Sequence, residues 1–583
     1  MGGRTLGKGE ELVRALEELA ELSEIKGEVR FKVNAYHKAA EIARSRGDEL
    51  LALDDVKELR KYPGIGEGIA KKILEFKHTG TISKLEELKE EVPVELISLL
   101  QVPNLGPKRA KLIYDELGVR TVEELQAAAE AHRLAELHGL GPKAESNILE
   151  GIRHMQSTSG RLLLHTAHRI QEGIANSLRE RLPGLEISPA GSLRRMKETI
   201  GDIDLLVASR DPSAVMEAFC SLEMVEKVLL RGDTKSSVVT LGGLQVDLRV
   251  VKPEEYGAAL QYFTGSQAHN VHVREIAKKD GKKINEYGVF RVKDDRRLAG
   301  ATEEEVYAAL GMVCPPPEIR EDRGEVEAAL RGELPELVER KDIRGDLHAH
   351  TDASDGVADL LEMRKAAEKL GYRFLAVTDH AAGLKVAGGL PKERLLRQVE
   401  EIRKLNERGD SPVVLLAGSE LNIDNRGGLD YDDEVLALLD VVVVSVHAGF
   451  KQDRETVTRR VITAMRNPHV KIVAHPTGRL IGQRPPYDID LGAVMEEARR
   501  TDTALELNSF PDRLDLGDEN LMRARALGVK IALGTDAHRP EHLDFMLFGV
   551  ATARRGWLSP SDLLNALEPD ELLRWLWRGR PGA

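Results

Sequence analysis

The chain has 583 residues, of which 42% are hydrophobic and 4% aromatic, and its formal net charge is −13. A single hydrophobic core stops growing at roughly 250–300 residues, so this length predicts several domains. No apolar run reaches about 18 residues, and the first ten residues lack the apolar stretch of a signal peptide, which predicts a cytoplasmic protein without a membrane partner. The negative charge argues against indiscriminate nucleic-acid binding but permits local basic patches. The two cysteines, Cys220 and Cys314, indicate neither a zinc knuckle nor a disulfide framework.

Residues 1–160 have the periodicity of helices and contain one short pattern three times. In each copy we expect a helix to end, a tight glycine turn to follow and a second helix to begin at the last glycine. The unpaired backbone N–H groups at the start of that second helix would suit a phosphate. The copies are Pro63-Gly64-Ile65-Gly66 with Ile73, Pro103-Asn104-Leu105-Gly106 with Ile113, and Gly139-Leu140-Gly141 with Ile148.

Basic residues follow each copy, and the pattern resembles helix-hairpin-helix DNA-binding elements. The alternative is that the glycines merely close a helical hairpin, but three copies with aligned isoleucines favour binding. A monovalent cation is a further candidate ligand of such elements. The basic residues are Lys71, Lys72, Lys108, Arg109, Lys111 and Lys143, and the candidate DNA contacts here are Gly64, Gly66, Gly106, Lys108 and Gly141.

Residues 185–250 change to patterns typical of strands, at 203–207, 237–241 and 244–250. Gly242-Gly243 predicts a hairpin turn between the last two. Residues 251–313 mix helices with short strands. Cys314-Pro315-Pro316-Pro317 then interrupts the chain, and the charged stretch that follows, up to Arg344, predicts an interdomain linker containing a helix.

From Gly345 onward, strand, loop and helix alternate, which predicts a β/α barrel of seven strands. Helices are expected between the strands, for example at 389–408 and 454–466. The strand candidates are 343–349, 374–378, 413–418, 441–446, 471–474, 503–507 and 530–534.

A candidate metal site begins at the strand 203–207. Asp202 and Asp204 are two residues apart and therefore point to the same face of the strand. Adjacent carboxylates raise each other's pKa and are hard to sustain without a cation, and Asp247 could reach the same face from the strand 244–250. Three carboxylates around two Mg²⁺ or Mn²⁺ ions would support in-line phosphoryl displacement.

A phosphate-binding pattern precedes these carboxylates. Gly191 permits close approach to a phosphate, Ser192 offers a hydroxyl and Arg195 offers a forked cation. Together with Gly201-Asp202-Ile203-Asp204 and Tyr262-Phe263-Thr264-Gly265-Ser266, this pattern resembles the DNA polymerase X family, to which DNA polymerase beta belongs. The resemblance covers about residues 1–315.

The resemblance implies a multidomain protein with helical N-terminal domains and an α+β nucleotidyltransferase palm. The implied regions are a 5′-phosphate-binding domain with one helix-hairpin-helix at 1–82, fingers with two more at 83–155, a palm at 156–250 and a thumb at 251–315. The charged stretch and the strand-helix alternation then predict a linker at 316–342 and a C-terminal domain at 343–583.

Roles for single residues also follow from the resemblance. Asp202, Asp204 and Asp247 would bind the two metal ions. Tyr262 and Phe263 would lie against the sugar and exclude a ribose 2′-hydroxyl. The remaining nucleotide contacts would be Gly191, Ser192, Arg195 and Gly201 at the triphosphate, Gly265 in the sugar-facing motif, Asn270 at the minor-groove edge of the base and Arg274 at the template strand.

Three positions depart from the family pattern. Ile200 and Gln267 stand where DNA polymerase beta carries a serine and an aspartate near the nucleotide. Gly68 stands where a phosphate-binding lysine is expected. These departures leave the details of nucleotide and phosphate contact open.

The 5′-phosphate pocket is matched by Lys32, Tyr36 and Lys38, and Lys72 matches the lysine that forms a Schiff base with an abasic sugar. A deoxyribose-phosphate lyase activity is therefore a hypothesis. The alternative is a Lys72 that only contacts phosphate or solvent, because a lyase lysine needs a lowered pKa.

The C-terminal region carries metal-ligand residue types at or just after the C-terminal ends of its apolar runs. In β/α barrels that edge carries the active site. Nitrogen and oxygen ligands without thiolates suit two or three Zn²⁺ and/or Mn²⁺ ions, and such a cluster favours hydrolysis of phosphate esters. The nine candidates are His348, His350, Asp355, His380, Glu420, His447, His475, Asp536 and His538.

Two motifs resemble the polymerase and histidinol phosphatase (PHP) domain, over about residues 340–575. They are Asp346-Leu347-His348-Ala349-His350-Thr351 and Gly534-Thr535-Asp536-Ala537-His538. The resemblance implies a seven-stranded barrel with all nine family ligands present. Spacing does not assign ligands to individual ions.

The two resemblances together imply a bacterial family X DNA polymerase that fills short gaps in DNA repair. Its partners would be dNTPs and gapped or nicked DNA with a 5′-phosphate, and we expect a monomer. The PHP domain would act as a 3′–5′ exonuclease, an abasic-site endonuclease or both. The alternatives are template-independent nucleotide transfer by the palm, small-molecule phosphatase activity of the barrel, or a catalytically silent scaffold that binds DNA ends.

Overall fold

The computed structural model describes residues 8–581 except Pro63, Gln101, Pro103, Asn104, Ser159, Gly160 and Gly242. Pro63, Pro103, Asn104 and Gly242 belong to turns expected from the sequence and lie outside the described residues. The chain divides into two compact units, one of residues 1–159 with 480–485 and one of residues 160–479 with 486–583.

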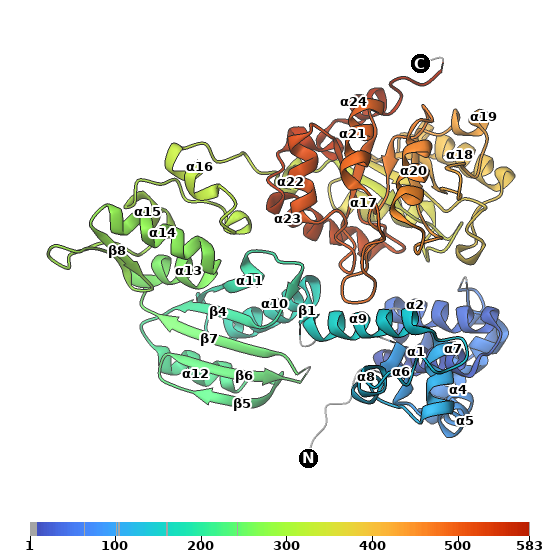
Figure 1. Ribbon diagram of the computed structural model, residues 1–583, viewed down its shortest axis with the longest axis horizontal. Helices are drawn as coiled ribbons and strands as arrows, with labels where there is room; N and C mark the ends of the chain where they lie inside the picture. Colours follow the sequence, from blue (N-terminus) through green and yellow to red (C-terminus); the bar gives the residue numbers. More distant parts are fainter. Residues whose placement is uncertain are drawn as a thin grey trace. The chain divides into compact units, whose positions relative to one another are not determined.

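Residues 8–158 form helices (Figure 1). The expected repeat is confirmed, because a helix begins directly after each of Gly66, Gly106 and Gly141. The apolar residue of each turn and the isoleucine seven residues after its last glycine are buried, so the pattern marks the core of each hairpin. The helices are α1 (Lys8–Lys26), α2 (Arg30–Ala52), α3 (Val56–Leu59), α4 (Glu67–Thr79), α5 (Ser83–Glu91), α6 (Leu96–Leu100), α7 (Pro107–Leu117), α8 (Val122–Glu130) and α9 (Pro142–Thr158).

The first glycine of the first and third hairpins differs from the last glycine in backbone conformation or in the space around it. Gly64 and Gly139 have φ of +95° and +90°, in the left-handed region that favours glycine. Gly66 and Gly106 have φ of −77° and −82°, which other residues adopt readily. A Cβ placed on Gly66, Gly106 or Gly141 would meet no atom within 4 Å. The last glycine of each copy therefore leaves open space at the start of the following helix.

A five-stranded sheet begins the second unit, in the order β2-β4-β7-β6-β5. The central neighbours β4 and β7 are parallel and the other pairs are antiparallel. The three strands expected from the sequence here are confirmed. The elements are β1 (Leu162–Leu163), α10 (Leu164–Arg181), β2 (Glu186–Pro189), α11 (Gly191–Arg194), β3 (Thr199–Ile200), β4 (Ile203–Ala208), α12 (Pro212–Cys220), β5 (Val225–Arg231), β6 (Lys235–Thr240) and β7 (Gln245–Val251).

The thumb region follows the sheet and combines helices with a small antiparallel sheet ordered β10-β9-β8. It contains α13 (Tyr256–Thr264), α14 (Gln267–Lys279), β8 (Lys282–Asn285), β9 (Gly288–Arg291), β10 (Arg297–Ala299) and α15 (Glu303–Ala308). The segment expected to be a linker holds one helix, α16 (Glu325–Arg331). Val326 and Ala329 of α16 belong to the same buried core as α14 and α15, so this part of the segment packs into the thumb.

The C-terminal region is a nearly closed parallel barrel, as expected, with strands in the order β11 to β17. A parallel bridge between Ala349 and Ala537 brings the end of β17 back to β11. The strands are β11 (Gly345–Ala349), β12 (Phe374–Val377), β13 (Val414–Asn422), β14 (Val441–Ser445), β15 (Ile472–Val473), β16 (Ala504–Asn508) and β17 (Ile531–Gly534).

Helices surround this barrel (Figure 1). They are α17 (Leu360–Lys369), α18 (Lys392–Glu407), α19 (Asp433–Leu436), α20 (Arg454–Met465), α21 (Leu491–Thr501), α22 (Asp518–Ala526), α23 (Met546–Arg555) and α24 (Pro569–Leu576). Short 3₁₀ turns occur at η1 (Pro253–Glu255), η2 (Pro317–Ile319), η3 (Arg340–Asp342), η4 (Lys385–Ala387), η5 (Pro540–Phe545), η6 (Pro560–Asp562) and η7 (Leu564–Ala566).

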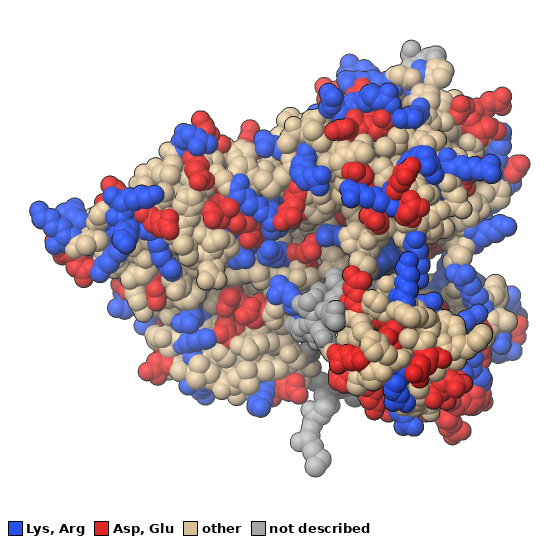
Figure 2. Space-filling view, viewed as in Figure 1, with Lys and Arg blue, Asp and Glu red and all other residues tan. Residues whose placement is uncertain are grey.

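Basic and acidic side chains are interspersed over the visible surface (Figure 2), as the mixed composition predicts. Within the described part of the chain, no helix is both long and apolar enough to cross a membrane.

Candidate functional site

The nine candidate ligands of the barrel all lie at one edge of it. His348 and His350 stand at the end of β11, and Glu420 lies near the end of β13. The others follow β11, β12, β14, β15 and β17, namely Asp355, His380, His447, His475, Asp536 and His538. In a parallel barrel the carboxyl ends of all strands meet at the same edge, so these residues converge although they are distant in sequence.

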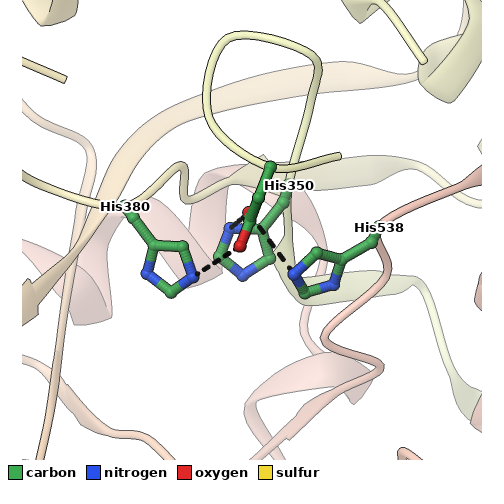
Figure 3. Close-up of side chains that lie close together, drawn as sticks. His350, His380 and His538 are labelled. Atoms are coloured by element: carbon green, nitrogen blue, oxygen red, sulfur yellow. Dashed lines mark ion pairs between the residues drawn. The ribbon is translucent and has the colours of Figure 1, made fainter. Parts of the chain in front are cut away.

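Three groups of ligand atoms lie close enough to share a metal ion. The first surrounds Asp355, whose Oδ2 is 3.5 Å from His380 Nε2 and whose Oδ1 is 3.4 Å from His538 Nε2. Figure 3 shows His350, His380 and His538 turned toward this carboxylate. The groups are His350 with Asp355, His380 and His538; His348 with His350 and Asp536; and His380 with Glu420 and His447.

Glu420 connects the groups. Its Oε1 lies 3.3 Å from His447 Nε2 and 3.0 Å from His475 Nε2. Its Oε2 lies 2.9 Å from His380 Nδ1, yet neither of these atoms has a partner with hydrogen-bond geometry. Because both atoms are buried, this arrangement fits a shared cation.

The chemistry of the site fits a metal cluster. Besides those two atoms, His350 Nδ1 and His475 Nδ1 are buried without a hydrogen-bond partner among the described residues. Buried polar atoms are nearly always paired, so several orphans in one place indicate absent ligands. The donor set is histidine nitrogen and carboxylate oxygen, which suits Zn²⁺ or Mn²⁺.

The pKa values of two histidines in the site also indicate that it binds metal ions. Burial alone would lower the pKa of His380, but Glu420 and Asp355 raise it to about 10. Burial likewise opposes the charge of His538, whose pKa is raised to about 9 by Asp355 and Asp536. The buried carboxylates thus demand positive charge, which bound metal ions would supply in place of protons.

Further side chains hold the ligands in place, and sequence reasoning missed them. Glu506 in β16 accepts a hydrogen bond from His348 Nδ1 at 2.7 Å and from the backbone N–H of His475 at 2.6 Å. Asn422 Oδ1 lies 2.7 Å from His447 Nδ1. Such contacts fix the ring orientation of metal-binding histidines. The available signal was an acidic residue inside the apolar strand 503–507.

Arg513 is a third residue that the sequence pattern did not reveal. Its Nε lies 3.5 Å from Asp536 Oδ2 within the barrel site. The backbone carbonyl of Arg513 accepts a hydrogen bond from Arg479 Nε at 2.8 Å, which fixes the loop that carries it. A guanidinium at a metal cluster can bind phosphate oxygens.

The palm carboxylates lie on two neighbouring strands. Asp204 of β4 and Asp247 of β7 are directly opposite each other in the parallel register, while Asp202 is exposed just before β4. Burial and the nearby charges of Asp202 and Asp247 raise the pKa of Asp204 to about 6. A cation bound beside Asp204 would offset this repulsion and favour the ionised carboxylate.

Asp247 is held by neighbouring side chains. Lys235 Nζ lies 2.6 Å from Asp247 Oδ2, and Gln245 Nε2 donates to Asp247 Oδ1 at 2.9 Å. Burial alone would raise the pKa of Asp247, but hydrogen bonds from Lys235, Gln245 and Ser237 lower it. Among the described residues, compact groups of three ligand residues occur in the barrel and not in the palm. A metal ion in the palm would therefore compete with Lys235 for Asp247.

The expected phosphate loop lies against Asp204. Gly191 has φ of +57°, and a Cβ there would stand 2.6 Å from Asp204 Oδ2, so only glycine fits this position. Ser192 is half-buried in α11, and Gly201 lies next to Arg161. Arg195 follows α11 and donates through Nη1 to the carbonyl of Thr264 at 2.6 Å.

The residues expected to face the sugar lie at the end of α13. The rings of Tyr262 and Phe263 are 5.0 Å apart in an edge-to-face arrangement. Asn270 Nδ2 donates to the carbonyl of Tyr262 at 2.7 Å, and the guanidinium of Arg274 lies 5.3 Å from the Tyr262 ring centre. Gly265 follows α13 with φ of +71°.

The N-terminal candidates gather partly around Tyr36. The ammonium of Lys72 lies 5.8 Å from the centre of the buried Tyr36 ring. The side chain of Lys38 packs over Gly64, where a Cβ would stand 2.8 Å from its Cε. Lys32 is exposed and 3.7 Å from Glu28. Lys108 is exposed directly after Gly106 and Pro107.

Comparisons with known proteins agree with this architecture. Residues 8–82 match the helix-hairpin-helix domain, residues 96–154 the SAM-like helix-hairpin-helix tandem, residues 259–321 the DNA polymerase beta thumb and residues 346–484 the PHP domain. Over 558 residues the chain is 42% identical to the DNA polymerase/3′-5′ exonuclease PolX of Bacillus subtilis (strain 168), covering 95% of this chain and 97% of that protein. The chain belongs to the PolX family.

More distant relatives share parts of the PolX chain. DNA polymerase lambda of Rattus norvegicus is 26% identical over 330 residues, which is 52% of this chain and 54% of that protein. A probable phosphatase of Thermoanaerobacter sp. (strain X514) is 33% identical over 204 residues, which is 33% of this chain and 78% of that protein. The PHP match ends at residue 484, so Asp536 and His538 lie beyond it and join the cluster through the fold.

Proposed function

We propose that this PolX-family protein is a DNA polymerase whose PHP barrel is a 3′–5′ exonuclease. The observation that carries the proposal is the presence of two separate candidate metal sites in one chain. One is the pair Asp204 and Asp247 on adjacent palm strands. The other is the barrel cluster, in which eight of the nine candidate ligands form close groups and His475 lies beside Glu420. The 42% identity to the PolX of Bacillus subtilis over nearly the whole chain supports the same assignment.

In the palm, Asp202, Asp204 and Asp247 would hold two Mg²⁺ or Mn²⁺ ions, which activate a 3′-hydroxyl and neutralise the triphosphate when bound. The nucleotide would bind beside these carboxylates. Gly191, Ser192, Arg195 and Gly201 would contact the triphosphate. Tyr262, Phe263 and Gly265 would contact the sugar, Asn270 the base and Arg274 the template strand.

In the barrel, the nine ligands would hold two or three Zn²⁺ and/or Mn²⁺ ions, which supply a water nucleophile and bind phosphate oxygens. Glu506 and Asn422 keep the rings of His348 and His447 oriented toward the cluster. Arg513, which lies beside Asp536, would donate a hydrogen bond to a phosphate oxygen of the DNA. Cleavage of abasic sites would use the same site on another phosphodiester.

The helix-hairpin-helix elements would hold gapped or nicked DNA by its backbone. The open space over Gly66, Gly106 and Gly141 admits a phosphate to the N–H groups at the start of each following helix. Such contacts do not read sequence, which suits repair of arbitrary gaps. Lys32, Tyr36 and Lys38 would form the pocket for the 5′-phosphate.

A lyase activity of Lys72 is a further hypothesis, supported by its place beside Tyr36. The neutral amine of Lys72 would condense with the aldehyde of an abasic sugar, with loss of water, and borohydride would reduce the resulting Schiff base to a stable adduct. A covalent adduct that is lost in Lys72→Ala would support the hypothesis. An adduct that persists in Lys72→Ala would remove it.

The test of the two-site proposal is a pair of substitutions. Asp204→Ala should abolish nucleotide incorporation on gapped DNA and spare degradation of a DNA 3′ end, because the palm carboxylate takes no part in the barrel. His350→Ala should do the reverse. Loss of both activities in either folded variant would contradict the proposal.

A second candidate function for the barrel is hydrolysis of a small phosphate ester, favoured by the 33% identity to a probable phosphatase. Histidinol phosphate and a DNA duplex with a recessed 3′ end distinguish the two. Release of phosphate from the first without shortening of the second would replace the exonuclease assignment.

A further inference from the structure

The chain between thumb and barrel carries acidic and basic side chains at residues 318–323, and several of them form ion pairs with other parts of the second unit. Partners come from the palm, the thumb and the barrel, so this short segment is where the three meet. The ion pairs are Glu318–Arg554, Arg320–Glu303, Glu321–Arg195, Glu321–Arg555 and Arg323–Asp518.

Arg195, the proposed triphosphate contact, is oriented by this segment. Its Nε donates to Glu321 Oε1 at 3.0 Å, and its Nη1 donates to the carbonyl of Thr264 at 2.6 Å. Two of its three guanidinium nitrogens are therefore held by protein oxygens. Within the described residues Nη2 is the nitrogen without such a bond, and it remains available to a phosphate oxygen.

Arg555, the last residue of the barrel helix α23, reaches both parts of this arrangement. Its Nη1 donates to the backbone carbonyl of Arg195 at 2.7 Å and to Glu321 Oε1 at 3.0 Å. Its Nη2 donates to Asp518 Oδ2 on α22 at 2.6 Å, which fixes the guanidinium from the barrel side. One barrel side chain thus holds the backbone of Arg195 and the carboxylate that orients its side chain.

Burial makes these contacts strong and specific. The side chains of Glu321 and Arg555 are 11% and 4% exposed, so water screens them weakly. Burial alone would raise the pKa of Glu321, but Arg195 and Arg555 lower it. The carboxylate is shared between two guanidinium groups, and removal of one changes how it holds the other.

We propose that Arg555 is a positioning residue for nucleotide addition. Acting through Glu321 and through the backbone of Arg195, it keeps the Arg195 guanidinium aimed at the triphosphate of the incoming nucleotide. The barrel would then contribute to nucleotide binding with a residue that takes no part in its metal cluster. This inference rests on the proposed polymerase function.

The test measures single-nucleotide incorporation by the full-length protein on gapped DNA over a range of dNTP concentrations. For Arg555→Ala we expect KM for the dNTP to rise about tenfold, the equivalent of about one charge-assisted hydrogen bond. We expect kcat to change by less than about twofold, because the palm carboxylates are untouched. Arg555→Lys keeps the charge but cannot bridge two acceptors in the same plane, so its KM should be intermediate.

Arg554→Ala is the matched control. Arg554 is the neighbouring arginine of α23 and binds Glu318 and the carbonyl of Val338 instead of the palm. Its substitution should leave KM for the dNTP unchanged. Degradation of a DNA 3′ end by the barrel should be normal in all these variants, which reports that the barrel is folded.

If Arg555→Ala does not fold, Glu321→Gln tests the same contact. It weakens the ion pair between Arg555 and Glu321 by changing the carboxylate instead of the guanidinium. It should raise KM for the dNTP as Arg555→Ala does, and the double variant should show no further rise, since both changes break one chain of contacts. An unchanged KM in Arg555→Ala and Glu321→Gln, or an equal rise in Arg554→Ala, would overturn the inference. A wild-type protein that incorporates no nucleotide would instead overturn the polymerase proposal, and this inference with it.

Discussion

Glu303 of α15 is a carboxylate buried between two guanidinium groups. Arg194 of the palm donates to Glu303 Oε1 at 2.9 Å, and Arg320 pairs with the same oxygen from the other side. The side chain of Arg320 is 1% exposed, so little water is available to compensate its charge in place of this carboxylate. Removing one member of a buried ion pair is costly because the other charge is left uncompensated. The contact therefore ties palm, thumb and the segment after the thumb together.

The pKa of Glu303 gives this contact a pH dependence. Burial alone would raise the pKa, but Arg320 and Arg194 lower it to about 2, from an ordinary value of 4.5. A lowered acid pKa stabilises the folded state above pH 4.5, and this stabilisation is lost as the pH falls toward 2. Glu303→Gln should therefore lower the free energy of unfolding by about 3 kcal/mol at pH 7, and the difference from wild type should shrink below pH 4.5.

Urea unfolding of both proteins at pH 7 and pH 3 measures this difference. Glu304→Gln, at the adjacent exposed position of α15, is the control and should have a small effect at both values. A destabilisation by Glu303→Gln that stays constant between pH 7 and pH 3 would show that the contact is not ionic.

At the scale of elements, helix α7 is preceded by one glycine and ends at another. Gly106 precedes α7 with φ of −82° and open space around it. Gly118 ends the same helix with φ of +70° and is also in open space. The two positions thus differ in backbone conformation and in the end of the helix that they occupy.

Gly106→Ala should weaken binding of gapped DNA about tenfold, because the added methyl group obstructs a phosphate at the N-terminus of α7. Its stability should change by less than about 1 kcal/mol. Gly118→Ala should show the opposite pattern, with stability lowered by about 1–2 kcal/mol through its positive φ and DNA binding retained. Fluorescence anisotropy with labelled gapped DNA and thermal melting measure the two quantities. Equal DNA affinity of the two variants would remove the phosphate role of Gly106.

At the scale of the whole molecule, the barrel cluster joins strands from its first to its last. His348 lies in β11 and Asp536 comes just after the end of β17. Ions bound between them would therefore link the first strand of the barrel to the last. Ions that bind the folded barrel and not the unfolded chain raise stability by about 2.7 kcal/mol at a hundredfold excess over Kd. Metal content should therefore control the melting of this region.

Chelation should lower the melting temperature of the protein, and addition of Zn²⁺ or Mn²⁺ should restore it. Glu420→Gln should lose most of that response, because Glu420 contacts ligands of several groups. Asp204→Asn, in the palm, should keep it. Scanning calorimetry measures the melting temperature of each protein, and a parallel metal analysis measures how much metal it binds. A full metal response in Glu420→Gln would place the stabilising ions elsewhere.

Local pattern and topology determined much of this protein from its sequence. The three hairpins follow from glycine spacing, and the seven barrel strands follow from apolar runs of the right length. The nine barrel ligands could be predicted because a parallel barrel brings all strand ends to one edge. Asp204 and Asp247 could be predicted as neighbours because each sits on an alternating strand with its carboxylate on the same face.

Tertiary structure alone decided the contacts that support these sites. Glu506 and Arg513 were not found, because a charged residue in a strand or loop has no spacing that identifies its partner. The same holds for Arg195, whose partners Glu321 and Arg555 come from distant segments. The sequence left the contact between palm and barrel open, because ion pairs between domains depend on how surfaces meet and not on any periodicity. That meeting places a barrel arginine on the backbone of the proposed triphosphate contact.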